Sequence, residues 1–140
     1  MIDFFIPCNP PKSTAQGSSR IMKRRDGTHF VGRCANSKAA KAKANLLTLL
    51  HPHRPETPIE GPLELIVGWA YPWRKSEPKK NRVDGFKWCD TRPDVDNLAK
   101  MLLDAMTTAG FWNDDGQIAS LCFEKTWSDR PGIKIVIGKL

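Results

Sequence analysis

Between Asp94 and Asp115 the chain carries five aspartates and one lysine, a combination that suits a metal ion. Asp94 and Asp96 open this segment, and the adjacent pair Asp114–Asp115 closes it. Carboxylates that converge on one point all stay ionised only if a positive charge compensates them. Mg²⁺ fits, because it takes oxygen ligands and is commonly held by a few carboxylates together with a substrate phosphate. The residue types therefore predict metal-assisted hydrolysis of a phosphodiester, with Asp94, Asp96 and Asp115 as candidate ligands.

Lys100 adds a positive charge one helical turn after Asp96. A lysine in this position would stabilise the charge that develops on a phosphate in the transition state. A structural alternative exists for each residue: Asp94 as a helix cap, Asp96 with Lys100 as an ion pair, and Asp114 as a turn residue. The occurrence of all of them in one short segment favours the catalytic interpretation.

The rest of the chain is basic, which makes the acidic segment stand out. The net charge is +7, and from Lys12 to Arg54 ten lysines and arginines face a single acidic residue. A basic surface attracts polyanions, whereas a bare carboxylate cluster repels them unless a divalent cation lies between. We therefore expect a nucleic acid as partner. The predicted phosphate contacts come from Lys12, Arg20, Lys23, Arg24, Arg25, Lys79, Lys80 and Arg82.

One amphipathic helix must position most of the acidic residues. The pattern predicts a helix over Pro93–Ala109, with Gly110 as its C-terminal cap. At 100° per residue, one arc is polar and the opposite arc is apolar. The polar arc comprises Asp96, Asn97, Lys100 and Asp104, and the apolar arc comprises Leu98, Met101, Leu102, Ala105 and Met106. Asp115 lies in the turn that follows, from which we expect it to face Asp94 and Asp96.

The remaining pattern predicts a single α+β domain over residues 1–140, with a mixed sheet of about four or five strands and two main helices. Strands are expected at 2–7, 63–73, 117–127 and 133–137, a basic hairpin around Asp26–Gly27, and a second helix at 38–50. Residues 51–62 read as a proline-rich connector, and 74–90 as a long basic loop. In that loop, Trp88 is the best candidate for stacking on a splayed base, whereas Trp112 is expected in the core.

Several functional classes find no support in the residues. There is no apolar run near 18 residues, no basic-then-apolar start typical of a secretory signal, and no phosphate-binding GxxxxGK motif. A Ser/His/Asp or Cys/His nucleophile set is also not apparent. We therefore expect a protein without membrane contact, in the cytoplasm.

The acidic segment resembles the motif of RusA-type Holliday junction resolvases of bacteria and their phages. The similarity rests on RPDVDNLAK, LDAM and GFWNDDGQI, between Arg92 and Ile118. It implies a RusA-like endonuclease domain that forms a homodimer and cuts four-way DNA junctions by symmetric paired nicks, using Mg²⁺ or Mn²⁺ as a substitute. It further implies that Asp94, Asp96 and Asp115 are essential metal-site carboxylates, that Lys100 is catalytic, and that the protein acts in a bacterial or phage-infected cell.

Two alternatives stay open at this stage. The chain could be a non-catalytic nucleic-acid-binding protein whose carboxylates only stabilise a turn. It could also be a nuclease for other branched DNA such as flaps, because the sequence does not show how DNA arms are held.

Overall fold

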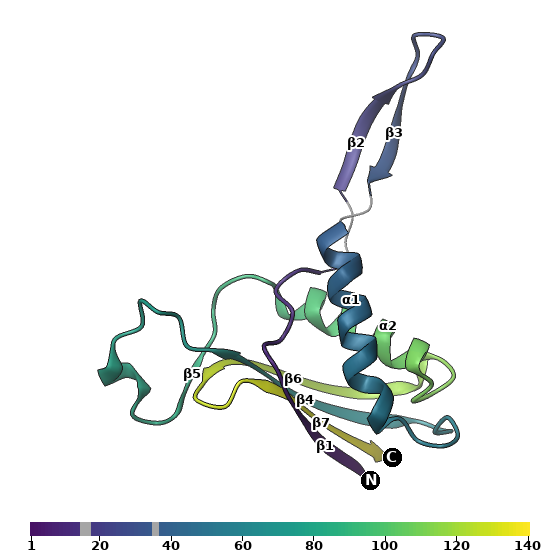
Figure 1. The fold of residues 1–140 in the computed structure, drawn as a ribbon. Helices are drawn as coiled ribbons and strands as arrows, with labels where there is room; N and C mark the ends of the chain where they lie inside the picture. The colour runs from purple at the N-terminus through teal and green to yellow at the C-terminus, as the bar shows by residue number, and fades with distance from the viewer. Residues whose placement is uncertain (15–17, 35–36) are drawn as a thin grey trace.

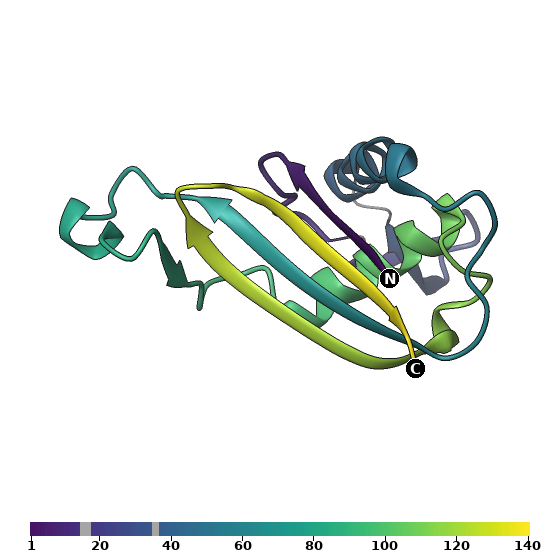
Figure 2. The ribbon, with the colours of Figure 1, turned by 90° about the horizontal axis from the view of Figure 1, so that it is seen from below.

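The computed structural model describes residues 1–14, 18–34 and 37–140. Two helices lie on one side of a five-stranded sheet, and a two-stranded hairpin extends away from them (Figures 1 and 2). The elements in chain order are β1 (Ile2–Pro7), β2 (Ser18–Lys23), β3 (His29–Cys34), α1 (Ser37–Leu50), β4 (Leu63–Pro72), β5 (Phe86–Trp88), α2 (Val95–Ala109), β6 (Ile118–Ser128) and β7 (Gly132–Lys139). The predicted α+β class, with two main helices and a mixed sheet, is confirmed.

The sheet has the strand order β1-β7-β4-β6-β5, in which only β4 and β6 run parallel. Parallel strands need a crossover connection, and here the crossover carries α2 across one face of the sheet. The strands bury alternate residues beneath the helices, because successive side chains point to opposite faces. In β4 and β7 these residues are Leu63, Leu65, Val67, Trp69, Tyr71, Ile133, Ile135 and Ile137.

Helix α2 has the two faces that its sequence predicts. Leu98, Met101, Leu102, Ala105 and Met106 are all buried, whereas Asp96 and Lys100 are exposed. The helix ends at Gly110, whose φ of 90° lies in the left-handed region that favours glycine. It begins two residues later than predicted, at Val95, because Asp94 is still extended (φ −70°, ψ 146°).

Two segments differ from their prediction. Residues 74–90 are more than a loop, because they contain a short 3₁₀ helix at Lys79–Arg82 and the edge strand β5, which pairs with β6. The connector 51–62 begins with a 3₁₀ turn at His51–His53. Partners distant in the sequence define β5, so local periodicity did not predict it.

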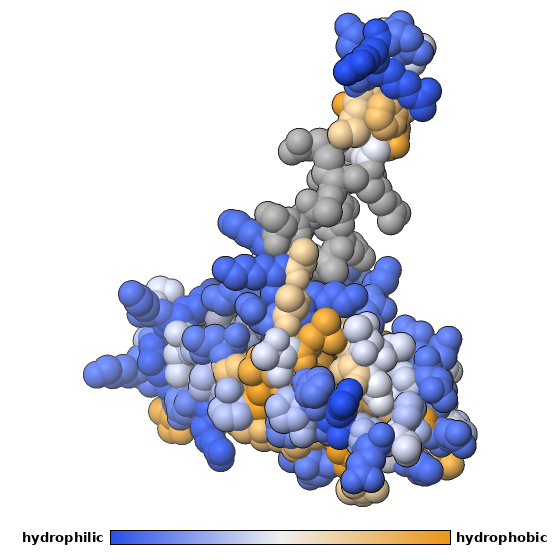
Figure 3. Space-filling model, turned by 45° about the vertical axis from the view of Figure 1, so that its right-hand side comes forward, coloured by the Kyte–Doolittle hydropathy of each residue, from blue (hydrophilic) through white to orange (hydrophobic). Residues whose placement is uncertain are grey.

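The basic hairpin is confirmed as β2 and β3, which pair with each other and form a sheet of their own. Its tip is hydrophilic, and hydrophobic residues follow between the tip and the body (Figure 3). Ile21 and Val31 oppose each other there, 77% and 72% exposed.

In the part of the chain that the structure describes, no helix combines the length and apolarity that crossing a bilayer requires.

Candidate active site

Asp94 and Asp96 lie at the N-terminus of α2 and are both exposed. Asp94 occupies the N-cap position, and its backbone carbonyl accepts from the Leu98 amide at 3.1 Å, but its side chain does not cap the helix. The partial positive charge of a helix N-terminus favours carboxylates at this place. Within residues 1–14, 18–34 and 37–140, neither carboxylate accepts a hydrogen bond or forms an ion pair. Both are therefore available to a ligand.

Lys100 is also exposed and does not pair with Asp96, although the two are four residues apart on α2. Among the described residues, the ion pairs join Glu77 to Arg74 and to Lys87, and Asp3 to Lys134. Asp94 thus takes the cap position without a side-chain cap bond, and among the described residues the alternative ion pair between Asp96 and Lys100 does not form.

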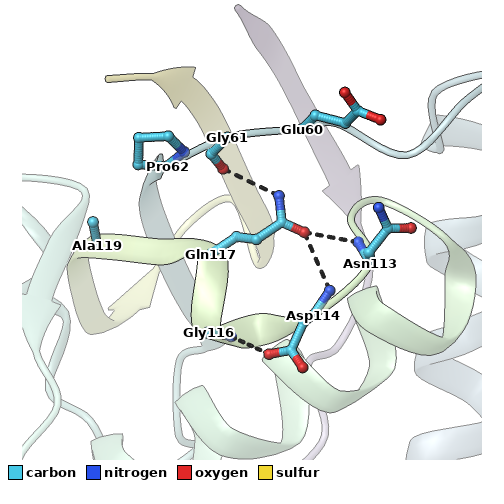
Figure 4. A pocket seen from close by; sticks show the side chains of 8 residues that line it. All are labelled: Glu60, Gly61, Pro62, Asn113, Asp114, Gly116, Gln117 and Ala119. Carbon is cyan, nitrogen blue, oxygen red and sulfur yellow. Dashed lines mark hydrogen bonds between the residues drawn. The ribbon is translucent and has the colours of Figure 1, made fainter.

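The turn after α2 uses Asp114 and Gln117 to build itself. Asp114 Oδ1 accepts from the Gly116 amide at 2.6 Å, and Gln117 Oε1 accepts from the amides of Asn113 (2.9 Å) and Asp114 (3.2 Å). Gln117 Nε2 donates to the carbonyl of Gly61 (Figure 4) and to the carbonyl of Ile59, which ties the turn to the segment before β4. Asp114 and Gln117 therefore act as a reciprocal capping box for the 3₁₀ helix Asp115–Gln117.

Asp115 has no such structural contact. Its side chain is exposed and, in the part of the chain described, takes no hydrogen bond or ion pair. Gly116 allows the tight turn beside it, since a Cβ there would lie 2.9 Å from Asp114 Oδ1. Trp112 anchors the turn from below: it is buried, as predicted, and its Nε1 donates to Thr107 Oγ1 at 2.7 Å.

The structure does not bring Asp115 to Asp94 and Asp96 within one chain. Asp115 lines a shallow hollow of about 250 Å³ with Asp104 and Thr107, together with Lys43, Thr108 and Asp114. At about 1.5 Å per residue, Thr107 lies roughly 16 Å along the α2 axis from Asp96. Among the described residues, no three His, Cys, Asp or Glu side chains form a group that could hold a metal ion. The candidate ligands therefore stand at two ends of one helix.

Sequence reasoning missed Lys125, which holds the segment that leads into α2. This lysine lies on β6 and is only 8% exposed. Its Nζ donates to the carbonyl of Pro93 at 2.6 Å and also to the carbonyl of Thr91. Its position was a usable signal, since it falls between Phe123 and Trp127 on the inward face of a strand, where a charge needs buried partners. Lys125 thus fixes the backbone directly before Asp94.

The residues predicted to contact phosphate lie in three places. Lys23, Arg24 and Arg25 are exposed at the hairpin, where the Arg24 guanidinium lies 4.9 Å from the Phe30 ring centroid, and Arg20 belongs to β2. Lys12 Nζ lies 5.9 Å from the ring centroid of Tyr71, whose hydroxyl donates to Pro11 O. Burial raises the pKa of Tyr71 to about 12, so this hydroxyl keeps its proton.

The third place is the segment before the acidic residues. Lys79 and Lys80 are exposed in the 3₁₀ helix. Arg82 is half-buried and donates to the carbonyls of Arg74 (3.2 Å) and Glu77 (3.0 Å), so its guanidinium also holds this segment together.

The fold and these residues define an α+β chain in which carboxylates without a partner among the described residues lie at the N-terminus of one amphipathic helix and in the turn after its C-terminus. A family model described as Endodeoxyribonuclease RusA matches residues 10–138. The chain is 34% identical over 128 residues to the uncharacterized protein YqaN of Bacillus subtilis (strain 168), covering 88% of this chain and 87% of that protein. It is 36% identical over 76 residues to the crossover junction endodeoxyribonuclease rusA of Lactococcus phage r1t, covering 54% of this chain and 53% of that protein. The chain therefore belongs to the RusA family of endodeoxyribonucleases, as its motif indicated.

Proposed function

We propose that this chain is a Mg²⁺-dependent endodeoxyribonuclease that resolves four-way DNA junctions by symmetric paired nicks. The observation that carries the proposal is the state of Asp94, Asp96 and Asp115, which are exposed and lack any partner among the described residues. The chain belongs to a family of endodeoxyribonucleases, and carboxylates without a partner suit the metal-dependent hydrolysis of a DNA phosphodiester. The phage relative named a crossover junction endodeoxyribonuclease supports the choice of substrate.

The donor set fits Mg²⁺, with Mn²⁺ as a substitute, since carboxylate oxygens are the ligands that these cations prefer. Asp94, Asp96 and Asp115 would hold the ion, which supplies an activated water and neutralises charge on the phosphodiester. Lys100, exposed on the same polar face of α2 as Asp96, is the proposed electrostatic stabiliser of the transition state.

The separation of the ligands within one chain supports a homodimer. Asp115 lies beside the C-terminal half of α2, whereas Asp94 and Asp96 lie at its N-terminus. A twofold axis that sets two α2 helices antiparallel would bring Asp115 of one copy toward Asp94 and Asp96 of a second copy. Such a dimer would carry two equivalent sites, which is what two nicks on opposed strands of a junction need.

The first experiment incubates the protein with a synthetic four-way junction, a flap and a matched linear duplex, with Mg²⁺ or with EDTA. We expect paired nicks in the junction with Mg²⁺, none with EDTA, and an intact linear duplex. Cutting of the flap but not of the junction would show that the substrate is another branched DNA and not a four-way junction. Binding without any metal-dependent cutting would leave a non-catalytic DNA-binding protein.

The second experiment tests whether a site is shared between copies. Asp94→Asn and Asp115→Asn are each inactive as homodimers under the proposal, so the informative species is the dimer that contains one chain of each. If the site is shared, this mixed dimer keeps one intact site and converts a supercoiled cruciform plasmid to nicked circles. If each chain carries its own site, both sites are damaged and the plasmid stays uncut.

A further inference from the structure

Residues 73–90, here called the basic lobe, are organised around one buried carboxylate. The side chain of Glu77 is 5% exposed and accepts from Lys87 at 2.9 Å, Asn81 at 3.1 Å and Arg74 at 3.3 Å. Hydrogen bonds from Lys87 and Asn81 hold the pKa of Glu77 below its ordinary value. With three side chains on one anion, the basic lobe has a defined shape in spite of its irregular sequence.

The basic lobe presents two aromatic rings that the core does not use. Phe86 and Trp88 are 46% and 59% exposed, and their ring centroids lie 5.7 Å apart with the planes at 85°. Lys87 lies between them in β5 and opposes Trp127, which is buried on the helix-covered face. Since side chains alternate along a strand, Phe86 and Trp88 point to the opposite, uncovered face of the sheet.

Charge and position give this aromatic pair a candidate partner. Lys79 and Lys80 are exposed on the same lobe, and the lobe continues directly into the segment that Lys125 holds. Trp88 is six residues before Asp94, so the two lie no more than about 22 Å apart, or roughly six stacked nucleotides. The rings point to the face of the sheet opposite α2, but β5 is the edge strand, so a strand of DNA at the acidic residues would reach them by passing round this edge.

We infer that Phe86 and Trp88 form a stacking platform for an unpaired or unstacked base at the branch point of the DNA substrate. The inference rests on the proposed function, because only interrupted stacking exposes the face of a base. Aromatic side chains bind every base through its ring face, so the platform recognises the branch and not a sequence. It gives the enzyme a contact with branched DNA that a linear duplex does not offer.

A second copy of the chain is the other possible occupant of an exposed aromatic pair. The surrounding charge argues against it, because the lysines of the basic lobe would approach those of any copy paired symmetrically through this face. The phosphate backbone of DNA has the complementary charge.

The test compares Trp88→Ala and Phe86→Ala with Val83→Ala, which removes a side chain on the same lobe that is 83% exposed but not aromatic. Binding to a four-way junction and to a matched linear duplex is measured in EDTA at one salt concentration. We expect Trp88→Ala to weaken junction binding roughly 5- to 150-fold, the range for loss of one stacked base. Duplex binding and Val83→Ala should stay within about twofold of wild type.

Three further measurements separate stacking from other roles. Trp88→Phe keeps a ring and should recover most of the lost affinity. A junction carrying 2-aminopurine at the branch, whose fluorescence falls when it stacks, should be brighter in the complex with Trp88→Ala than with wild type. The salt dependence of junction binding should be unchanged in Trp88→Ala, whereas Lys79→Ala with Lys80→Ala should lower its log–log slope by about two units.

Equal losses on junction and duplex would overturn the inference, as would wild-type binding by Trp88→Ala. A shift of Trp88→Ala from dimer to monomer in sedimentation would assign the rings to a protein interface and overturn it as well. None of these results touches the proposed function if wild type still cuts the junction with Mg²⁺. If wild type neither binds nor cuts the junction, the proposed function itself fails.

Discussion

Glu77 and Asp96 both have basic residues close by in the chain, but their carboxylates are in opposite states. Glu77 is buried and accepts from Arg74, Asn81 and Lys87, whereas Asp96 is exposed and does not pair with Lys100. The first carboxylate organises the protein, and the second is left for something that the protein binds. Hydrogen-bond partners, more than the residue type, thus distinguish a structural acid from a candidate catalytic one.

The same difference separates two neighbours in the chain. Asp114 accepts from the Gly116 amide and builds the turn, while Asp115 projects from that turn without a partner in the described part of the chain. One peptide bond therefore separates a cap from a candidate metal ligand.

The largest expected effect comes from removing charge at Asp115 and at the start of α2. Asp94→Asn, Asp96→Asn and Asp115→Asn should each lower the cleavage rate by about 10³-fold or more, since metal catalysis contributes several kcal/mol. Junction binding should stay intact or tighten, because a negative charge facing phosphate is lost. Rates come from single-turnover cleavage, and affinities from binding in EDTA.

Asp114→Asn is the matched control, because it removes the same charge one residue away and keeps an oxygen that can accept from Gly116. We expect nearly wild-type cleavage. Asp114→Ala should instead lower the free energy of unfolding by about 0.5–2 kcal/mol, as for other lost caps. If Asp114→Asn and Asp115→Asn lowered the cleavage rate equally, the distinction between Asp114 as a cap and Asp115 as a metal ligand would be wrong.

Lys100→Ala should have the next largest effect. Loss of one electrostatic stabiliser typically lowers the rate about 10²- to 10³-fold, with little change in affinity. The measurement is the cleavage rate at saturating protein, compared with the dissociation constant for the junction. A weaker affinity with an unchanged saturated rate would make Lys100 a phosphate anchor.

Lys125→Met should weaken metal binding by about 10- to 100-fold. This is the usual loss when a residue that positions the metal ligands, without itself contacting the metal, is removed. The variant leaves the carbonyls of Thr91 and Pro93 without their buried donor. Mn²⁺ binding is read by electron paramagnetic resonance, independently of cleavage. Lys125→Arg should restore part of the affinity, and a variant that lowers thermal stability without moving Mn²⁺ affinity would limit Lys125 to a structural role.

Glu77→Gln should have the smallest effect, and one that depends on pH. The pKa of Glu77 is lowered in the folded state, so its contribution to stability is complete above the ordinary glutamate value of about 4.3 and is lost as pH falls through the lowered pKa. At pH 7 the melting temperature of wild type should therefore be higher than that of Glu77→Gln, and the difference between the two melting temperatures should shrink below pH 4. Melting curves by circular dichroism between pH 3 and 7 test this, and a constant difference would contradict it.

The parts of the fold that depend on local pattern could be predicted from the sequence. The faces of α2, its end at Gly110 and the hairpin at Asp26–Gly27 follow from helical periodicity and turn chemistry. Strand β5 could not be predicted in this way, because its three residues are defined by pairing with β6, about 40 residues later. The same holds for Glu77, whose burial depends on Lys87 across the lobe.

The candidate site divides similarly. The identity of the acidic residues follows from the motif, but the free state of Asp115 and the engaged state of Asp114 depend on Gln117 and its contact with Ile59 and Gly61. The separation of Asp115 from Asp94 and Asp96 also could not be predicted, because it depends on how the turn that carries Asp115 packs beside α2.

The strand order has a consequence for synthesis of the protein on the ribosome. β7 lies between β1 and β4, so among the described strands β1 pairs only with β7, which is synthesised about 130 residues later, Ile2 opposite Ile137. Until residues 132–139 leave the exit tunnel, β1 has no neighbour and β4 has only β6. Long-range pairing of this kind slows folding and leaves strand edges open to other chains in the meantime. Chains that stall before Gly132 should therefore be aggregation-prone and strongly dependent on chaperones.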